Sequence, residues 1–187
     1  FESYAHALLH RLFGDRYARL VAPVGHVGKL ADAIVSFGDS AVVFEMKAKM
    51  FPEEVRGATS QERLDKKLSE TLVKGARQID ATIAALRTGG IAAGRFAGVR
   101  RVFPVILTLE RMPLLPSMYR SIQGDITAEN LLIGDHVAPW QAIQIDDLDA
   151  IEGPMNAGMD FLEVLEDKTG HEHALYEELV SFLHRAG

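Results

Sequence analysis

Two runs of mostly apolar residues, 31–37 and 40–49, flank the dipeptide Gly38-Asp39. A Gly-Asp pair between such runs is typical of a two-residue β-hairpin, because glycine readily takes the positive φ required at the first central position of a type II′ turn. Phe37 and Ser40 are then the first residues to pair across the hairpin. This pairing fixes the register of both strands.

The predicted register places Asp32 opposite Glu45. Directly opposed residues in a sheet have Cβ atoms roughly 4.5–5.5 Å apart, so two negative charges at these positions repel each other. Because strand side chains alternate, Glu45 and Lys47 share one face, while Phe44 and Met46 point to the other. We therefore expect one face of the hairpin to join the core and the other to carry the chemistry.

The hydrophobic periodicity also predicts helices and strands around this hairpin. Apolar residues recur every three or four positions in the expected helices and form short continuous runs in the expected strands. The helices are expected at about 1–13, 59–88, 146–151, 161–165 and 175–183, and the strands at about 102–109 and 140–145. This order predicts an α/β fold, a three-layer α/β/α sandwich with a central mixed sheet.

Local signals refine these elements. Thr59 and Glu62 have the spacing of a capping box at the start of the long helix, and Asp146 is expected to cap the helix that follows the last strand. Pro104 lacks a backbone N–H, so its strand is expected to begin at an edge or a bulge.

Asp32, Glu45 and Lys47 suit metal-assisted hydrolysis. Carboxylate and carbonyl oxygens are the ligands that Mg²⁺ and Mn²⁺ prefer, and a bound cation would relieve the repulsion between the two acids. With a lysine beside it, such a cation can polarise a phosphodiester, activate a water molecule and stabilise charge on the phosphoryl oxygens. The pattern favours a metal-dependent nuclease.

Asp32, twelve intervening residues and then Glu45-Met46-Lys47 resemble the signature of the PD-(D/E)XK nuclease superfamily, which has a restriction-endonuclease-like core. Ala31 stands where the family's name gives proline. The resemblance implies that Asp32, Glu45 and the Met46 carbonyl bind Mg²⁺ or Mn²⁺, and that Lys47 lies beside the nucleophilic water. It also implies cleavage that leaves 5′-phosphates.

The resemblance suggests two further site residues. Many members carry a glutamate on the helix before the sheet, which Glu2 matches, although an acid in a first helical turn is also favoured by the helix dipole alone. Some members carry a glutamine on the helix after the Glu-x-Lys strand, which Gln78 matches. Gln78 continues a polar stripe on that helix with Lys67, Thr71 and Lys74, and a solvated helix face is the alternative interpretation.

The distribution of charge along the chain bears on whether the protein binds nucleic acid. The net charge of −6 argues against binding nucleic acid, but residues 1–111 carry 17 Lys and Arg against 12 Asp and Glu, whereas residues 112–187 carry 3 against 14. The part that contains the hairpin is therefore basic. The residues expected to contact nucleic acid are Lys49, Arg56, Lys74, Arg95, Arg100 and Arg101. A solvated helix face is the alternative interpretation of Lys74, and a connector is that of the glycine-rich segment with Arg95, Arg100 and Arg101.

Length and composition set the remaining expectations. With 187 residues the default is a single domain, with a nuclease-like core at about 1–111 and an acidic extension at about 112–187. The absence of cysteine excludes disulfides and fits a cytoplasmic protein, and no apolar run is long enough for a membrane span. The chain starts with Phe1, which is compatible with a longer parent chain and further domains.

The first hypothesis is therefore a Mg²⁺- or Mn²⁺-dependent nuclease, with DNA as the expected substrate and an endonuclease favoured over an exonuclease. A nuclease-like module that binds or assembles without cleaving is the alternative, and the acidic extension favours it. A third possibility, an acid/base hydrolase that uses Asp32 and Glu45 without metal, predicts activity in EDTA. Cleavage of both strands would favour a homodimer.

Overall fold

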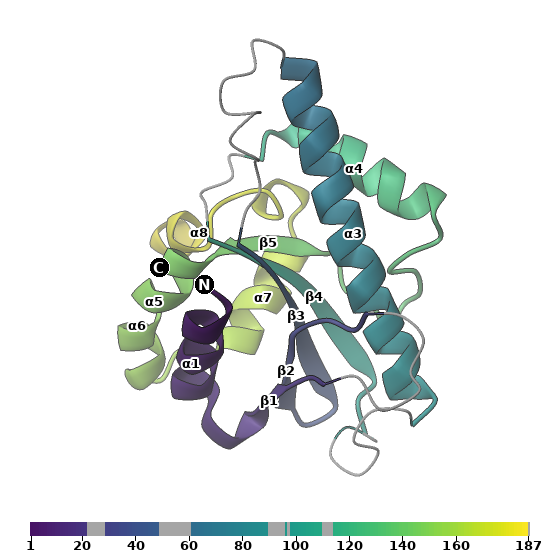
Figure 1. Cartoon of the computed structure of the whole chain (residues 1–187). Coiled ribbons are helices and arrows are strands. Elements are labelled where there is room, and N and C mark those ends of the chain that lie inside the picture. The colour runs from purple at the N-terminus through teal and green to yellow at the C-terminus, as the bar shows by residue number, and fades with distance from the viewer. Residues whose placement is uncertain (22–28, 49–60, 90–95, 97, 110–113, 187) are drawn as a thin grey trace.

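The computed structural model describes residues 1–21, 29–48, 61–89, 96, 98–109 and 114–186 (Figure 1). The strands are β1 (Tyr17–Arg19), β2 (Ala33–Phe37), β3 (Ser40–Lys47), β4 (Arg101–Thr108) and β5 (Gln141–Gln144). The helices are α1 (Glu2–Phe13), α3 (Gln61–Arg87), α4 (Pro116–Ala128), α5 (Ile145–Ala150), α6 (Glu152–Asn156), α7 (Phe161–Thr169) and α8 (Leu179–Ala186), with short 3-10 helices η1 (Gly14–Arg16) and η2 (Glu172–Ala174).

The five strands form one mixed sheet in the order β1-β2-β3-β4-β5. Neighbouring strands from β1 to β3 are antiparallel, and those from β3 to β5 are parallel. Helices cover both faces of this sheet (Figure 1). The predicted α/β sandwich with a central mixed sheet is therefore confirmed.

The hairpin has the predicted register. Phe37 pairs with Ser40, and Ile34 pairs with Val43. Gly38 has a φ of 77°, and it is the only one of the two turn residues with a positive φ, as a type II′ turn requires. The glycine at this position is thus needed for the turn that sets the sheet's register.

The alternation of side chains along the strands divides the core into two layers. On one face, Ile34, Val43 and Ile106 pack with α3 and α4. On the other, Val35, Phe44 and Val105 pack with α1, α5 and α7. The two groups of helices lie on opposite sides of the sheet in Figure 1, which gives the three layers.

The long helix α3 buries the stripe that its periodicity predicts. Leu68, Leu72, Ala76, Ile79 and Ile83 are all buried against the sheet or α4. The capping box predicted at Thr59 lies outside the described residues. Within the described part of the chain, no helix is both long and apolar enough to cross a membrane.

Other details differ from the sequence-based expectations. β1 and α4 were not predicted. Asp146 lies inside the first turn of α5, because the N-cap is Gln144, two residues earlier than expected. β4 is an interior strand and not an edge strand. Pro104 is tolerated there because its nitrogen, which has no hydrogen to donate, lies between the Val102–Val137 bridge and the Val105–Gln141 pair, where the ladder to β5 is interrupted.

We predict opposite effects of the same substitution at two exposed glycines. Gly38→Ala should lower the free energy of unfolding by about 1–2 kcal/mol, because a side chain disfavours the positive φ. Gly124→Ala is the matched control. This glycine lies inside α4, and no atom lies within 4 Å of the position that a Cβ would take, so alanine should raise the free energy by about 1 kcal/mol through helix propensity. Urea denaturation measures both, and equal effects would contradict the turn assignment.

Candidate active site

Glu45 and Lys47 lie at the end of β3 and face α3, where they meet Gln78. The Glu45 side chain is completely buried, and its two oxygens accept hydrogen bonds from Lys47 Nζ at 2.6 Å and Gln78 Nε2 at 3.0 Å. Gln78 Oε1 in turn accepts from Lys47 Nζ at 3.1 Å. The three side chains therefore form a closed triangle of hydrogen bonds, and each one fixes the position of the other two.

The close approach of α3 to this triangle depends on Gly75. A Cβ at this position would lie 3.1 Å from Ile106 Cδ1, 3.4 Å from Lys47 Cε and 3.5 Å from Glu45 Cγ. The missing side chain thus lets the helix axis approach β3 over the two charged residues. Gln78, less than one turn further along, is then in reach of both.

Asp32 lies immediately before β2, beside the end of β3. Its Oδ2 accepts a hydrogen bond from the Met46 N–H at 2.7 Å, and its own N–H donates to the Phe44 carbonyl at 3.0 Å. The carboxylate therefore occupies the place where the next strand residue would have paired. This keeps Asp32 at the open end of the hairpin, next to Glu45.

The Met46 carbonyl points to the same side as Asp32. The Lys47 carbonyl accepts from Leu109 N–H at 3.2 Å and so faces β4. Because consecutive residues of a strand direct their backbone polar groups to opposite sides, the N–H and C=O of Met46 both face the β2 side. β2 has ended there, so this carbonyl oxygen is directed toward the Asp32 carboxylate's side of the site.

The electrostatics of the site are dominated by the burial of Glu45. The pKa of Glu45 is raised to about 7, mainly by burial; the hydrogen bond and charge of Lys47 oppose this rise, the charge of Asp32 adds to it, and the charge of Lys29 opposes it. The nearby cations therefore do not fully compensate for the loss of solvent. Additional positive charge at this position would stabilise the ionised carboxylate.

The other predicted site residues are placed as follows. Glu2 is exposed in the first turn of α1, and its charge acts on His6 together with that of Asp32. Lys74 is exposed on α3, one turn before Gln78. Lys49, Arg56 and Arg95 lie outside the described residues.

The structure does not bring Arg100 and Arg101 to this site. Their backbone N–H groups donate to the Asp39 carbonyl, and Arg101 pairs with Ser40 at the start of β3. Glu45 lies five residues further along that strand, about 16 Å away. Arg101 also forms an ion pair with Glu166 at 3.4 Å.

The sequence did not single out three residues near Asp32. The His6 Nδ1 lies 2.6 Å from the Tyr17 hydroxyl, and burial and the charge of Arg19 hold the pKa of His6 below its ordinary value. Arg19 ends β1, which was itself not predicted. Nothing in their local sequence distinguishes these residues from ordinary surface positions.

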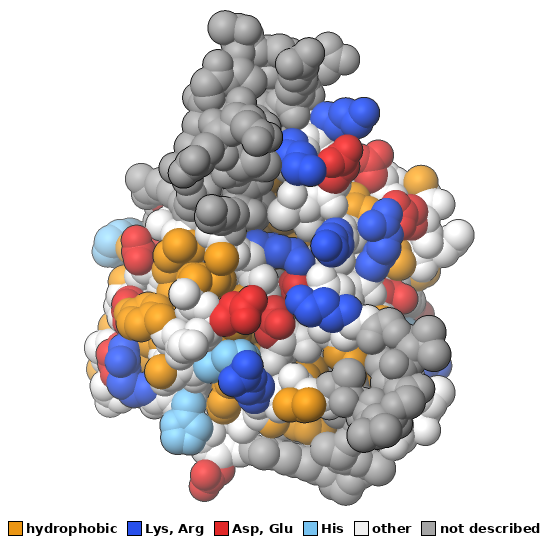
Figure 2. Space-filling view, in the orientation of Figure 1, with side chains coloured by type: hydrophobic (Ala, Val, Ile, Leu, Met, Phe, Trp, Pro, Cys, Tyr) orange, Lys and Arg blue, Asp and Glu red, His pale blue; other side chains and the backbone are white. Residues whose placement is uncertain are grey.

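Figure 2 shows the face onto which the site opens. Acidic side chains lie near its middle, with Lys and Arg side chains beside and above them. Among the described residues, no three His, Cys, Asp or Glu side chains converge as a metal-binding group. Side-chain ligands alone therefore do not complete a metal site here, and the backbone carbonyl is the additional oxygen donor in the predicted set.

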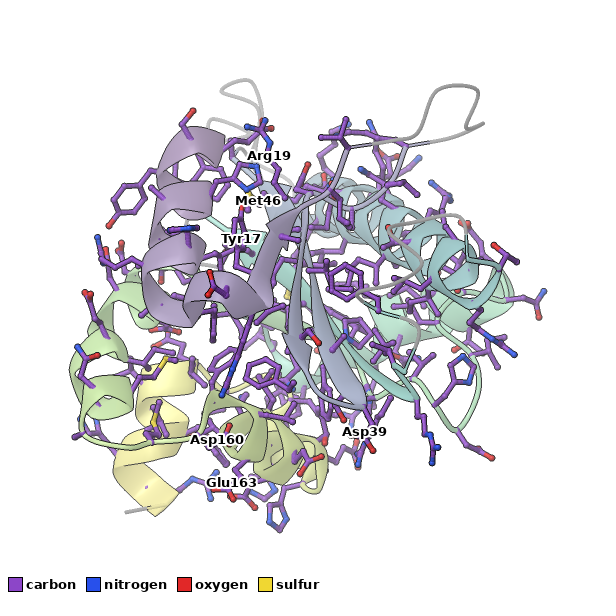
Figure 3. The ribbon with its side chains drawn as sticks, turned by 90° about the horizontal axis from the view of Figure 1, so that it is seen from below. Tyr17, Arg19, Asp39, Met46, Asp160 and Glu163 are labelled. Carbon is purple, nitrogen blue, oxygen red and sulfur yellow. The ribbon has the colours of Figure 1, made fainter. Side chains whose placement is uncertain are left out.

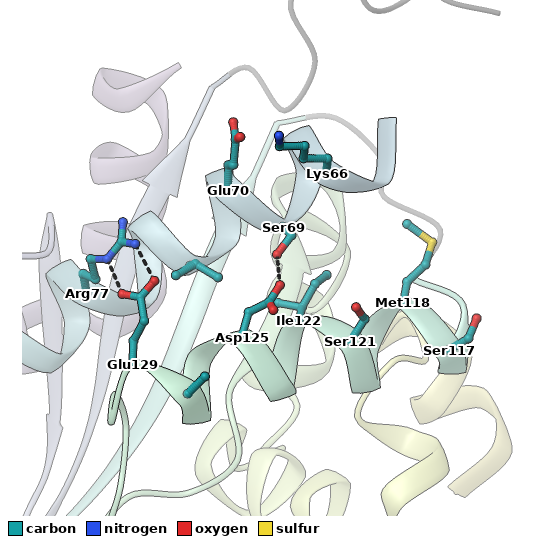
Figure 4. A pocket seen from close by; sticks show the side chains of 12 residues that line it. Lys66, Ser69, Glu70, Arg77, Ser117, Met118, Ser121, Ile122, Asp125 and Glu129 are labelled. Carbon is teal, nitrogen blue, oxygen red and sulfur yellow. Dashed lines mark hydrogen bonds and ion pairs between the residues drawn. The ribbon is translucent and has the colours of Figure 1, made fainter. Parts of the chain in front are cut away.

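A separate groove of about 740 Å³ lies between α3 and α4 (Figure 4). Two of its acidic side chains are bound by residues of α3. Arg77 donates two hydrogen bonds to Glu129 at 2.6 and 2.5 Å, and Ser69 donates to Asp125 at 2.5 Å. These contacts join α3 to α4 and are separate from the Glu45 triangle.

Comparisons with known proteins give little further information. No family model matches the chain, and no curated protein does. A solved structure, the small subunit of the heterodimeric restriction endonuclease R.BspD6I, aligns with 98% of this chain and 86% of its own length. Its sequence identity is 11% and its TM-score 0.46, too low to support an argument about fold or function.

We predict that Glu45 makes the metal-free protein less stable as pH rises. A folded-state pKa of about 7 against an ordinary 4.5 means that the folded state holds this proton more tightly, so stability is fully present below about pH 4.5 and is lost as pH rises through 7. The loss should approach about 3 kcal/mol. Glu45→Gln should remove this contribution.

The measurement is urea denaturation in EDTA across this pH range. Glu70→Gln on the same side of the sheet is the control, because Glu70 is exposed and pairs only weakly with Lys67. The difference in free energy of unfolding between wild type and Glu45→Gln should change with pH, whereas the difference between wild type and Glu70→Gln should not. Parallel stability curves for the Glu45 variant would contradict the prediction.

Proposed function

We propose that the protein is a Mg²⁺- or Mn²⁺-dependent nuclease that hydrolyses phosphodiester bonds, with DNA as the expected substrate. The observation that carries the proposal is the buried Glu45 carboxylate, which is bound by Lys47 and Gln78 and has Asp32 beside it across the hairpin. A buried acid next to a second acid is costly for a purely structural site. A divalent cation would offset that cost.

The donor atoms at this site fit such a cation. Asp32 and Glu45 supply carboxylate oxygens, and the Met46 carbonyl points to the same side, so all three are the hard oxygen ligands that Mg²⁺ and Mn²⁺ prefer. Glu2 is a further candidate ligand from α1. When bound, the cation would polarise the phosphodiester and lower the pKa of a water molecule.

Lys47 is the residue of this chain suited to the reacting water and phosphate. Its ammonium group is held by Glu45 and Gln78, yet the side chain keeps a 12% exposed fraction and so borders solvent. From there it can orient the attacking water and stabilise negative charge on the phosphoryl oxygens. Gln78 would act as a positioning residue, since it binds both Lys47 and Glu45.

The proposed reaction is hydrolysis. The water oxygen forms a bond to phosphorus, the bond from phosphorus to the 3′ oxygen breaks, and the proton released by water balances the one gained by the leaving oxygen. The products are a 5′-phosphate and a 3′-hydroxyl, as the resemblance to PD-(D/E)XK nucleases implies. Lys74 is exposed one turn before Gln78 and would contact the nucleic acid backbone.

A binding or assembly module without nuclease activity is the second candidate. Two observations favour it: both Glu45 oxygens already have donors within the chain, and the acidic charge is concentrated in residues 112–187. This function predicts a protein complex whose formation survives Asp32→Ala.

The test combines metal binding with cleavage. Mn²⁺ is titrated calorimetrically into the wild type and the Asp32→Ala/Glu45→Ala variant, and labelled single- and double-stranded DNA and RNA are incubated with each. We expect the variant to lose Mn²⁺ binding and at least about 100-fold in cleavage rate. Glu70→Ala/Glu163→Ala, which also removes two carboxylates, should retain both.

Circular dichroism tests whether each variant is folded, and Glu45→Gln, which has nearly the same shape, guards against misfolding of the alanine variant. Metal-dependent cleavage that persists in the Glu45 variants would overturn the assignment. Cleavage by the wild type in EDTA would indicate the metal-free hydrolase instead. Failure of the wild type to bind Mn²⁺, with or without nucleic acid, would favour the binding module.

A further inference from the structure

A cavity of about 570 Å³ adjoins the candidate active site, and Asp32 forms part of its wall. Two cationic side chains, Arg19 and Lys29, also line it. The rest of the described lining is mainly aliphatic and includes Leu20 and Val21, the latter with an exposed fraction of 77%. The cavity thus combines positive charge with exposed apolar surface.

The fold fixes where the first of these cations lies. Arg19 is the last residue of β1 and pairs with Ala33, while the Leu20 N–H donates to the Asp32 carbonyl at 2.9 Å. Arg19 is therefore held at the end of the sheet where Asp32 lies. Figure 3 shows Arg19 and Tyr17 on the side of the sheet that α1 covers, in the same region as Met46.

The second cation approaches from the segment before β2. Lys29 is exposed, and its charge reaches Glu45, where it favours the ionised carboxylate. The charges of Arg19 and Asp32 both reach His6, where Arg19 lowers the pKa and Asp32 raises it. The two cations therefore lie close to the acids of the site.

Neither cation is held in an ion pair within the described part of the chain. This distinguishes them from Arg77, Arg101 and Arg185, which bind glutamates. A cation that no described acid holds in an ion pair can bind an anionic ligand without first breaking such a contact. Because guanidinium groups bind phosphate through two parallel hydrogen bonds, Arg19 is well suited to a phosphodiester.

We propose that this cavity is a subsite for the backbone phosphate next to the scissile one, with Arg19 and Lys29 as its ligands. The proposal rests on the nuclease function proposed above. The scissile phosphate would lie between Asp32 and Lys47, and the chain would continue past Asp32 into the cavity. Leu20 and Val21 offer apolar surface to the attached sugar or base.

The test uses Arg19→Ala/Lys29→Ala and fluorescently labelled oligonucleotides in Ca²⁺. The dissociation constant should rise about 10- to 100-fold, because one or two charge-assisted contacts are lost. The slope of the logarithm of affinity against that of salt concentration should become shallower by about 1 to 2. In Mg²⁺, KM should rise while kcat stays within about threefold of wild type.

Arg120→Ala/Arg185→Ala is the matched control. It also removes two positive charges, but both arginines are exposed in the acidic part of the chain and pair with glutamates. We expect little change in its affinity or salt dependence. Arg19→Lys, which keeps the charge but not the two parallel hydrogen bonds, should recover part of the affinity lost in Arg19→Ala.

A neutral methylphosphonate, placed at one linkage at a time, identifies the phosphate. In the wild type, substitution of the linkage beside the scissile one should lower the affinity most. In the double variant, substitution of that linkage should no longer have this larger effect. Normal cleavage with unchanged KM and salt slope in the double variant would overturn the subsite and leave the nuclease function intact. A wild type that neither binds nor cleaves any oligonucleotide would overturn both.

Discussion

The burial of one carboxylate, that of Glu45, determines how the surrounding elements must be arranged. A charged group removed from water is unstable unless it is paired and hydrogen-bonded. Lys47 and Gln78 supply the partners, and Gly75 lets α3 come close enough to deliver one of them. The helix, the end of β3 and the site are therefore parts of one arrangement, so that a change in the position of α3 would alter the chemistry of the site.

The second constraint is that β3 extends beyond β2. The pairing of β2 with β3 ends at Ala33 and Phe44, so the Asp32 carboxylate accepts the Met46 N–H in place of a ladder partner and lies near Glu45. One strand end thus supplies a carboxylate and leaves a backbone carbonyl directed to the same side. Two acids and a carbonyl at an open strand end form a set of oxygen donors that a continuous ladder would have blocked.

The hairpin and the Gln78 helix were predictable because their signals are local. Gly38 marks the turn, and the spacing of two residues between the strands determines which side chains oppose each other.

The positions of Arg100 and Arg101 were not predictable in this way. Because β4 runs parallel to β3, its first residues lie beside the hairpin turn, whereas an antiparallel strand would have placed them near Lys47. Arg19 and Lys29 were missed for a related reason, because only the pairing of β1 with β2 shows that they lie beside the same site. β1 has three residues, too few for a periodic pattern in the sequence.

The charge asymmetry of the chain is consistent with this arrangement. α5 and α7 come from the acidic part of the sequence and pack on the face of the sheet opposite to α3. α4 is also from that part, but Glu129 and Asp125 are bound by Arg77 and Ser69. Glu129 is thus paired with a cation, while Lys74 and Lys29 remain exposed near the site. A polyanion approaching Glu45 and Lys47 would therefore meet positive charge, although the whole chain is acidic.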